Sequence, residues 1–390
     1  MFNFDKMIDR RGTGCLKWDV ADLFGLDRVE YPFWIADTDF PTVPEVVEAL
    51  KKRCEHPLFG YNIPGPDCVP AVSRWYGRRH GWQFDPDTAF TSIGVVTVLR
   101  FTIQALTQPG DKILIFTPGY DPFDGIITNT GRVVVENQLV RTADSYEIDF
   151  ELLEKQLAGG VRAVILCNPH NPVGRVWTRE ELKRLNELFI KYDLLIMSDE
   201  VHGDISIHGS QYTPMGTFPE IQDRLAVYTA ISKTFNLAGL QASCVVVPNE
   251  KLRAAIRAEL MKGWIMSPNP MACVAMEAAY NHGDQWLDAV NDYLTANSDH
   301  VCRRLENEMP KIWHSKHEGT FLMWLDFSCC GMTSNEVTHR LAAEYGVGLG
   351  NGGRYGAGSE GFMRFNIACC RSLLDKGLDG IKAFYDKYCK

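Results

Sequence analysis

Three groups of polar residues each follow directly on a short apolar run in the middle of this 390-residue sequence. Asn168 and Asn171 follow "AVILC", Asp199 follows "LLIMS", and Ser232 and Lys233 follow "AVYTAI". Such apolar runs are typical of strands that are buried on both faces of a parallel sheet. Because open parallel sheets bind ligands at the carboxyl ends of their strands, we expect an amide, a carboxylate and an amine to meet at one edge.

Each group alone has an ordinary explanation. A lysine at the end of a strand is usually a solvated surface group, an aspartate after a strand is often a helix cap, and "NPHNPVG" is rich in turn-forming residues. The order of the three groups favours a shared chemistry instead. Pyridoxal phosphate requires a lysine for a Schiff base and an acidic partner for its pyridine nitrogen. A lysine held as an imine has no charge, which explains how Lys233 can stand at the end of an apolar strand.

The surrounding sequence alternates strand-like and helix-like segments. We predict strands in residues 112–120, 132–140, 162–169, 194–200, 225–233 and 242–249. Asp149 is a candidate N-cap for a helix over 149–157, and Thr178 with Glu181 has the spacing of a capping box at the start of a helix over 178–193. This alternation predicts an α/β fold with a mostly parallel sheet covered by helices on both faces.

The pattern changes near residue 285, where residues 284–309 read as one long amphipathic helix. We therefore predict an N-terminal arm that belongs partly to a smaller domain (1–45), a large cofactor-binding domain (46–285) and a small C-terminal α+β domain (286–390).

The motifs "NPHNPVGRVW", "SDEVHGDI", "SKTFNLAGLQ" and "MRFNIACCR" resemble those of fold-type I pyridoxal phosphate enzymes, the aspartate aminotransferase superfamily. The chain resembles the MalY/PatB-type cystathionine β-lyases more closely, and the likeness extends from "WIADTDFPTVPEVVEAL" to the last helix. This resemblance implies a fold-type I enzyme, a homodimer with shared active sites, and an amino-acid substrate.

The resemblance also implies roles for individual residues. Lys233 forms the Schiff base, Asp199 pairs with the pyridine nitrogen, and Tyr120 stacks on the cofactor ring. The remaining implied roles are Asn171 and His202 near the ring O3′, Ser232 near the phosphate, Tyr61 at the phosphate of the partner subunit's site, and Arg364 and Asp37 on the substrate side.

A glycine opens the helix-like segment 92–110, so the backbone N–H groups of Gly94, Val95 and Val96 are candidates to hold the phosphate. A plain core helix is the alternative interpretation. Two positions depart from the pattern of aminotransferases, which have a phosphate-binding arginine and a serine where this chain has Gln241 and Ala230. Without this arginine, the sequence does not specify the full set of phosphate-binding residues. The absence of the arginine also favours the lyases over the aminotransferases.

Composition excludes other classes of protein. The net charge is −9 without a basic block, so we expect neither nucleic acid nor a membrane surface as partner. The first residues have no apolar core of a signal peptide, and we expect a cytoplasmic protein. The twelve cysteines are scattered without C-x-x-C spacing, so we interpret most of them as core residues and predict no metal site.

The predicted reaction is β-elimination from cysteine thioethers, such as cystathionine, to a thiol, pyruvate and ammonia. Two alternatives stay open from the sequence. An aminotransferase would share the early steps, and a regulatory or binding protein could keep the fold as a scaffold. The sequence does not specify the natural thioether.

Overall fold

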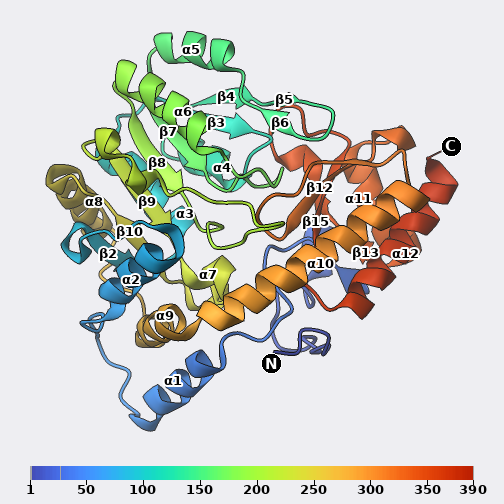
Figure 1. Ribbon diagram of the computed structural model, residues 1–390, viewed down its shortest axis with the longest axis horizontal. Coiled ribbons are helices and arrows are strands. Elements are labelled where there is room, and N and C mark those ends of the chain that lie inside the picture. Colours follow the sequence, from blue (N-terminus) through green and yellow to red (C-terminus); the bar gives the residue numbers. More distant parts are fainter. Residues whose placement is uncertain (1, 27, 390) are drawn as a thin grey trace.

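A computed structural model describes residues 2–26 and 28–389, and its largest feature is a seven-stranded sheet (Figure 1). The strand order is β2-β10-β9-β8-β7-β3-β4. The strands are β2 (Ala89–Ser92), β3 (Lys112–Thr117), β4 (Val133–Gln138), β7 (Val161–Cys167), β8 (Leu195–Asp199), β9 (Leu225–Thr229) and β10 (Ser243–Val246). Among these seven strands β10 alone runs opposite to the other six, so the predicted, mostly parallel sheet is confirmed.

Helices cover both faces of this sheet because successive strand residues point to opposite sides. In β3, Ile113 and Ile115 belong to one hydrophobic cluster, and Leu114 and Phe116 belong to the other. The first cluster includes residues of α3 (Val95–Leu106), α4 (Pro122–Thr128) and α8 (Glu250–Lys262). The second includes residues of α1 (Pro44–Glu55), α2 (Cys68–His80), α5 (Phe150–Ala158), α6 (Arg179–Lys191) and α9 (Pro270–His282).

Two predicted helix starts are confirmed in atomic detail. The Asp149 carboxylate accepts hydrogen bonds from the backbone N–H groups of Glu151 and Leu152 at the start of α5. Thr178 and Glu181 form the expected reciprocal capping box of α6. The spacing of nearby side chains therefore determines where these crossover helices begin. The start of each helix in turn fixes the length of the loop before it.

A second, antiparallel sheet lies beside the first and has the order β11-β12-β15-β14. Its strands are β11 (Trp313–His314), β12 (Leu322–Asp326), β14 (Gly350–Asn351) and β15 (Phe362–Asn366), and the helices of this part are α10 (Asp284–Glu308), α11 (Ser334–Tyr345) and α12 (Arg371–Tyr388). The long helix α10, drawn in orange in Figure 1, runs from the large sheet to this part, and its bounds agree with the helix predicted over 284–309.

Two short strand pairs complete the fold. β1 (Tyr31–Pro32) pairs in parallel with β13 (Val347–Gly348), so the N-terminal segment joins the C-terminal part. β5 (Val140–Arg141) and β6 (Tyr146–Glu147) form a hairpin after β4. The exact domain boundaries at residues 45 and 285 stay a prediction.

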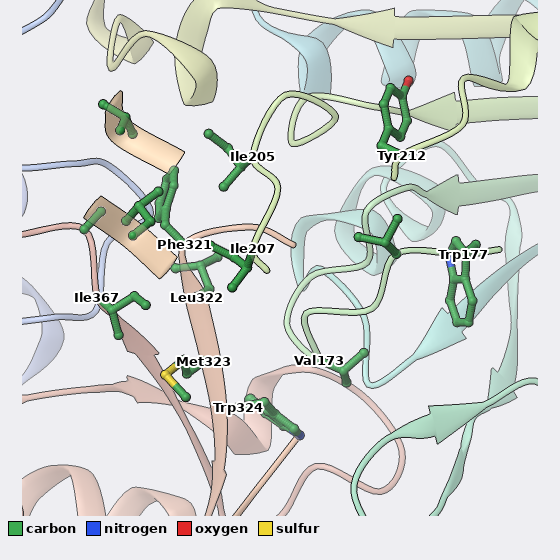
Figure 2. Close-up of a cluster of buried hydrophobic side chains, with 14 of the residues drawn as sticks. Val173, Trp177, Ile205, Ile207, Tyr212, Phe321, Leu322, Met323, Trp324 and Ile367 are labelled. Atoms are coloured by element: carbon green, nitrogen blue, oxygen red, sulfur yellow. The ribbon is translucent and has the colours of Figure 1, made fainter. Parts of the chain in front are cut away.

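Buried side chains connect the two sheets. Figure 2 shows Ile205 and Ile207, from the loop after β8, beside Phe321 and Leu322 near the start of β12. Backbone hydrogen bonds reinforce this contact, since the Ile207 N–H donates to the Glu318 carbonyl over 3.0 Å. The loop after β8 is therefore held against the start of β12, which pairs with β15, the strand that carries Arg364.

Candidate active site

The ends of three adjacent strands are aligned by the register of the sheet. Cys167 of β7 is paired with Asp199 of β8, which is paired with Tyr228 of β9. The ladder continues past the strands, because the Asn168 N–H donates to the Asp199 carbonyl over 2.9 Å. The short helix α7 (Ile231–Thr234) follows β9 and carries Lys233. The predicted convergence of the three polar groups at one edge is therefore present.

A cavity of about 200 Å³ lies at this edge. Nine sequence-predicted residues line it together: Gly94, Val95, Val96, Tyr120, Asn171, Asp199, His202, Ser232 and Lys233. Five further lining residues were missed by the sequence reasoning: Ala36, Thr97, Cys167, Val201 and Ala238. Thr97 could have been found, because it stands in the first turn of the helix that was predicted to hold the phosphate. The structure brings the predicted residues together, and their individual roles stay predictions.

The amine of Lys233 is partly buried and donates a hydrogen bond to the Ala36 carbonyl over 2.7 Å. Burial, and then the nearby positive charge of Arg364, lower the pKa of Lys233 to about 8, although Asp37 and Asp199 partly offset both effects. An amine with this pKa is largely neutral at mildly alkaline pH. It can then act as a nucleophile or as a base.

Asp199 is buried, and in the described part of the chain its carboxylate accepts one hydrogen bond, from the Val201 N–H over 3.3 Å. Burial raises the pKa of Asp199 to about 6, although the Val201 N–H and the charge of Lys233 act against this. His202 is also buried, and burial lowers its pKa well below the usual value, so its ring is neutral. Its Nδ1 has no partner among the described residues.

The first turn of α3 forms another wall of the cavity. Gly94 precedes the helix with φ at +34°, a backbone conformation that favours glycine, and no side chain caps the helix. The N–H groups at such a start have no intrahelical partner and attract anions. The positions that depart from the aminotransferase pattern lie elsewhere. Ala230 is a buried N-cap of α7, and Gln241 is exposed after the next turn.

A second cavity of about 560 Å³ shares Ala36, Tyr120 and Lys233 with the first, and Arg364 lines it. Arg364 is 6% exposed. Its guanidinium donates to the Trp34 carbonyl over 2.7 Å and to Asn171 Oδ1 over 3.4 Å, and its Nε has no partner among the described residues. A planar cation with unused donors beside a cavity suits a carboxylate ligand.

Two predicted site residues lie away from these cavities. The Asp37 carboxylate forms ion pairs with Arg10 over 2.7 Å and with Lys17 over 3.5 Å, and it lines neither cavity. Tyr61 is fully exposed on this chain and lines neither cavity either. Both ligand roles stay predictions.

The segment that carries Ala36 is fixed between Lys233 and Arg364 by residues that the sequence reasoning did not single out. Asn236 accepts from the Thr38 N–H over 3.0 Å and donates to the Phe40 carbonyl over 3.0 Å. From the other side, Asn366 donates to the carbonyls of Ile35 and Asp37, each over 2.6 Å. Only the folded chain reveals these bonds, because they join residues far apart in sequence.

The turn of Lys233 has a buried support of its own. The Asp204 carboxylate accepts hydrogen bonds from Thr234 over 2.7 Å, from Trp75 Nε1 over 2.8 Å and from His80 Nε2 over 2.6 Å. Asp204 is 4% exposed. It therefore ties α7 to α2.

The donor set fits pyridoxal phosphate. The cavity combines an amine of lowered pKa, a buried carboxylate with little other pairing, and an uncapped helix start. These suit an aldehyde, a pyridine nitrogen that carries a proton, and a phosphate dianion, respectively.

Comparisons with known proteins give consistent similarities. The family model described as aminotransferase class I and II matches residues 30–381. The chain is 40% identical to cystathionine β-lyase PatB of Bacillus subtilis over 98% of this chain and 99% of the relative.

Solved structures agree with these similarities. Cystalysin of Treponema denticola, whose structure contains pyridoxal 5'-phosphate, matches with a TM-score of 0.96 and 30% identity, covering 100% of both chains. The pyridoxal-phosphate-bound C–S lyase of Staphylococcus hominis matches with a TM-score of 0.91 and 32% identity, covering 98% of both chains.

Proposed function

This chain belongs to the aminotransferase class I and II family, and we propose that it is a pyridoxal-phosphate-dependent carbon–sulfur β-lyase. Its substrates are cysteine thioethers, with cystathionine as the first candidate. The products are a thiol, pyruvate and ammonia. The relatives described as cystathionine β-lyase and C–S lyase support this reaction over transamination.

The observation that carries the proposal is that Lys233 is shared by two cavities. The smaller cavity holds the donors that suit the cofactor, and the larger one holds Arg364. A substrate bound through its carboxylate at Arg364 would present its Cα next to the cavity that contains Asp199. The amine of Lys233 lies where the two ligands would meet.

The bound cofactor would hold the amino group of the substrate and take up the electron pair left when the Cα–H bond breaks. The N–H groups at the start of α3, with Ser232, would hold its phosphate, and Asp199 would hold the proton on its pyridine nitrogen. Asn171 has its Oδ1 near Arg364, which leaves its amide nitrogen for the ring oxygen. Tyr120 contributes an aromatic face to the same cavity.

Lys233 acts as the base that removes the Cα proton. Its lowered pKa, about 8, keeps a useful fraction of the amine neutral near physiological pH. Arg364 binds the α-carboxylate and fixes the orientation of Cα. The group on sulfur extends into the larger cavity, whose apolar wall includes Leu16, Leu26 and Leu349.

We also propose a homodimer. Exposed apolar side chains gather on two adjoining segments, where Asn62 donates to the Pro268 carbonyl over 3.2 Å. They are Leu58, Phe59, Tyr61, Ile63, Met261, Trp264 and Met266. An apolar patch of this kind is typical of a protein–protein interface, and it supports the prediction that Tyr61 reaches a partner's site.

The proposed location is the cytoplasm. None of the described helices is long and apolar enough to cross a membrane. The twelve cysteines are all unpaired in the structure, which is typical of proteins in a reducing compartment.

The test is a turnover assay without any keto acid. Purified holoenzyme is given cystathionine or S-methylcysteine, and pyruvate and thiol are measured together. We expect both products in equal amounts, and neither from Lys233→Ala. Product that forms only after 2-oxoglutarate is added would instead identify an aminotransferase.

A further inference from the structure

Three cysteines from two distant parts of the sequence meet in the small C-terminal part of the chain. Cys329 and Cys330 lie in the 3-10 helix η6 (Ser328–Cys330), which follows β12, and Cys389 directly follows α12. The Cys330 and Cys389 sulfurs are 2.7 Å apart, and the Cys329 and Cys330 sulfurs are 3.9 Å apart. All three sulfurs lie within 4.8 Å of one another.

This spacing suits coordination of one metal ion. Zinc–sulfur bonds of about 2.3 Å in tetrahedral geometry place sulfurs about 3.8 Å apart, which matches the 3.9 Å between the Cys329 and Cys330 sulfurs. The Cys330 and Cys389 sulfurs, 2.7 Å apart, must separate by about 1 Å for both to bind the same ion. Among the residues that the structure describes, no other trio of His, Cys, Asp or Glu side chains has such spacing. The sequence pattern did not reveal the site, because the third sulfur lies 59 residues from the adjacent pair.

The surroundings leave the three sulfurs partly accessible. Cys389 is buried, whereas Cys329 and Cys330 are half-buried, so the cluster is reached from one side. The Lys311 amine donates to the Cys389 carbonyl over 3.5 Å and brings a positive charge to the cluster. No residue of the candidate active site belongs to η6 or α12.

We propose that Cys329, Cys330 and Cys389 form a binding site for one thiophilic cation of the Zn²⁺ class. The three thiols release their protons to solvent as three metal–sulfur bonds form, and the fourth position is left to water or an added thiol. The bound ion ties the end of α12 to the turn after β12. The site is independent of the proposed lyase reaction.

The test measures zinc bound by the holoenzyme in equilibrium dialysis, in a phosphine reductant that keeps all thiols reduced. Wild-type protein is expected to hold one zinc per chain more than Cys389→Ser. The matched control is Cys54→Ser, which removes an exposed cysteine outside the cluster and should retain the full amount. The absorbance of the bound cofactor shows in parallel that each variant is folded.

A second measurement identifies the ligands directly. Holoenzyme is alkylated with iodoacetamide with and without zinc, and modified peptides are quantified by mass spectrometry. Zinc is expected to protect the peptides of Cys329, Cys330 and Cys389 but not that of Cys54. The proposal is overturned if zinc binding is equal in wild type and Cys389→Ser, if zinc leaves alkylation unchanged, or if Cys330 and Cys389 stay disulfide-linked in the reductant.

Discussion

Lys233 and Asp199 have pKa values that are shifted in opposite directions by the same cause. Burial penalises charge, so it lowers the pKa of Lys233 to about 8 and raises that of Asp199 to about 6. Both shifts favour neutral groups. A protonated pyridine ring beside Asp199 would supply the missing positive charge and return this carboxyl to its ionised form. Even without the cofactor, the charges of the site are therefore arranged to bind a positively charged ring.

The lowered pKa of Lys233 predicts how cofactor uptake depends on pH. Only the neutral amine attacks an aldehyde, so uptake by cofactor-free protein should rise about tenfold per pH unit below pH 8 and level off above it. With a lysine of ordinary pKa, the rate of cofactor uptake would continue to rise up to about pH 10.4. Stopped-flow absorbance after mixing with pyridoxal phosphate gives the rate. A rate that keeps rising to pH 10 would contradict the lowered pKa.

A second prediction for a single residue concerns Arg364. Replacement by lysine keeps the charge but removes the planar, two-donor geometry that grips a carboxylate. We expect Arg364→Lys to lower kcat/KM for cystathionine roughly tenfold to a hundredfold, the loss of a charged hydrogen bond. Cofactor absorbance should be unchanged.

The matched control is Arg354→Lys. Arg354 lines the same cavity but is exposed and ion-paired with Asp121 over 2.9 Å. We expect a much smaller effect there, because exposed ion pairs contribute little. Equal losses in both variants would exclude a special role of Arg364.

Among the elements, those with local signals could be predicted from the sequence. The capping box at Thr178 and the apolar runs of β7 and β8 are contained within a few residues, and the structure has them as expected. The antiparallel direction of β10 and the fixing of Ala36 beside Lys233 depend on contacts between distant residues. Alternating hydrophobicity specifies which residues are buried, but not which distant segments pair.

Asp204 shows how a missed residue controls an element. It accepts from Thr234, Trp75 and His80, so Asp204→Asn should leave buried donors poorly paired. We expect a loss of about 3 kcal/mol in the free energy of unfolding and faster cofactor loss, because α7 carries Lys233. Denaturant titration measures the first, and absorbance during dialysis measures the second.

Thr234→Val is the graded comparison for this prediction. It removes one of the three donors, so we expect about 1 kcal/mol of destabilisation. If Asp204→Asn destabilises the protein no more than Thr234→Val does, Asp204 does not organise the turn.

At the scale of the whole molecule, the proposed homodimer would bury the exposed apolar segments near Tyr61 and Trp264 in its interface. If Tyr61 completes the site of a partner subunit, then each active site needs residues from two chains. A Tyr61 variant and a Lys233 variant would then each remove a residue that a different chain contributes to the same site. Such variants can complement each other in a mixed dimer.

The last prediction uses this complementation. Tyr61→Ala is expected to weaken cofactor binding roughly tenfold to a hundredfold, since it removes a hydrogen bond to a charged phosphate. At limiting cofactor, an equal mixture of Tyr61→Ala and Lys233→Ala chains, unfolded and refolded together, should recover about a quarter of wild-type activity, because half of the dimers contain one intact site. Each variant refolded alone is the control. If Tyr61 instead served the site of its own chain, no mixed dimer would contain an intact site, and activity would stay at the level of the separate variants.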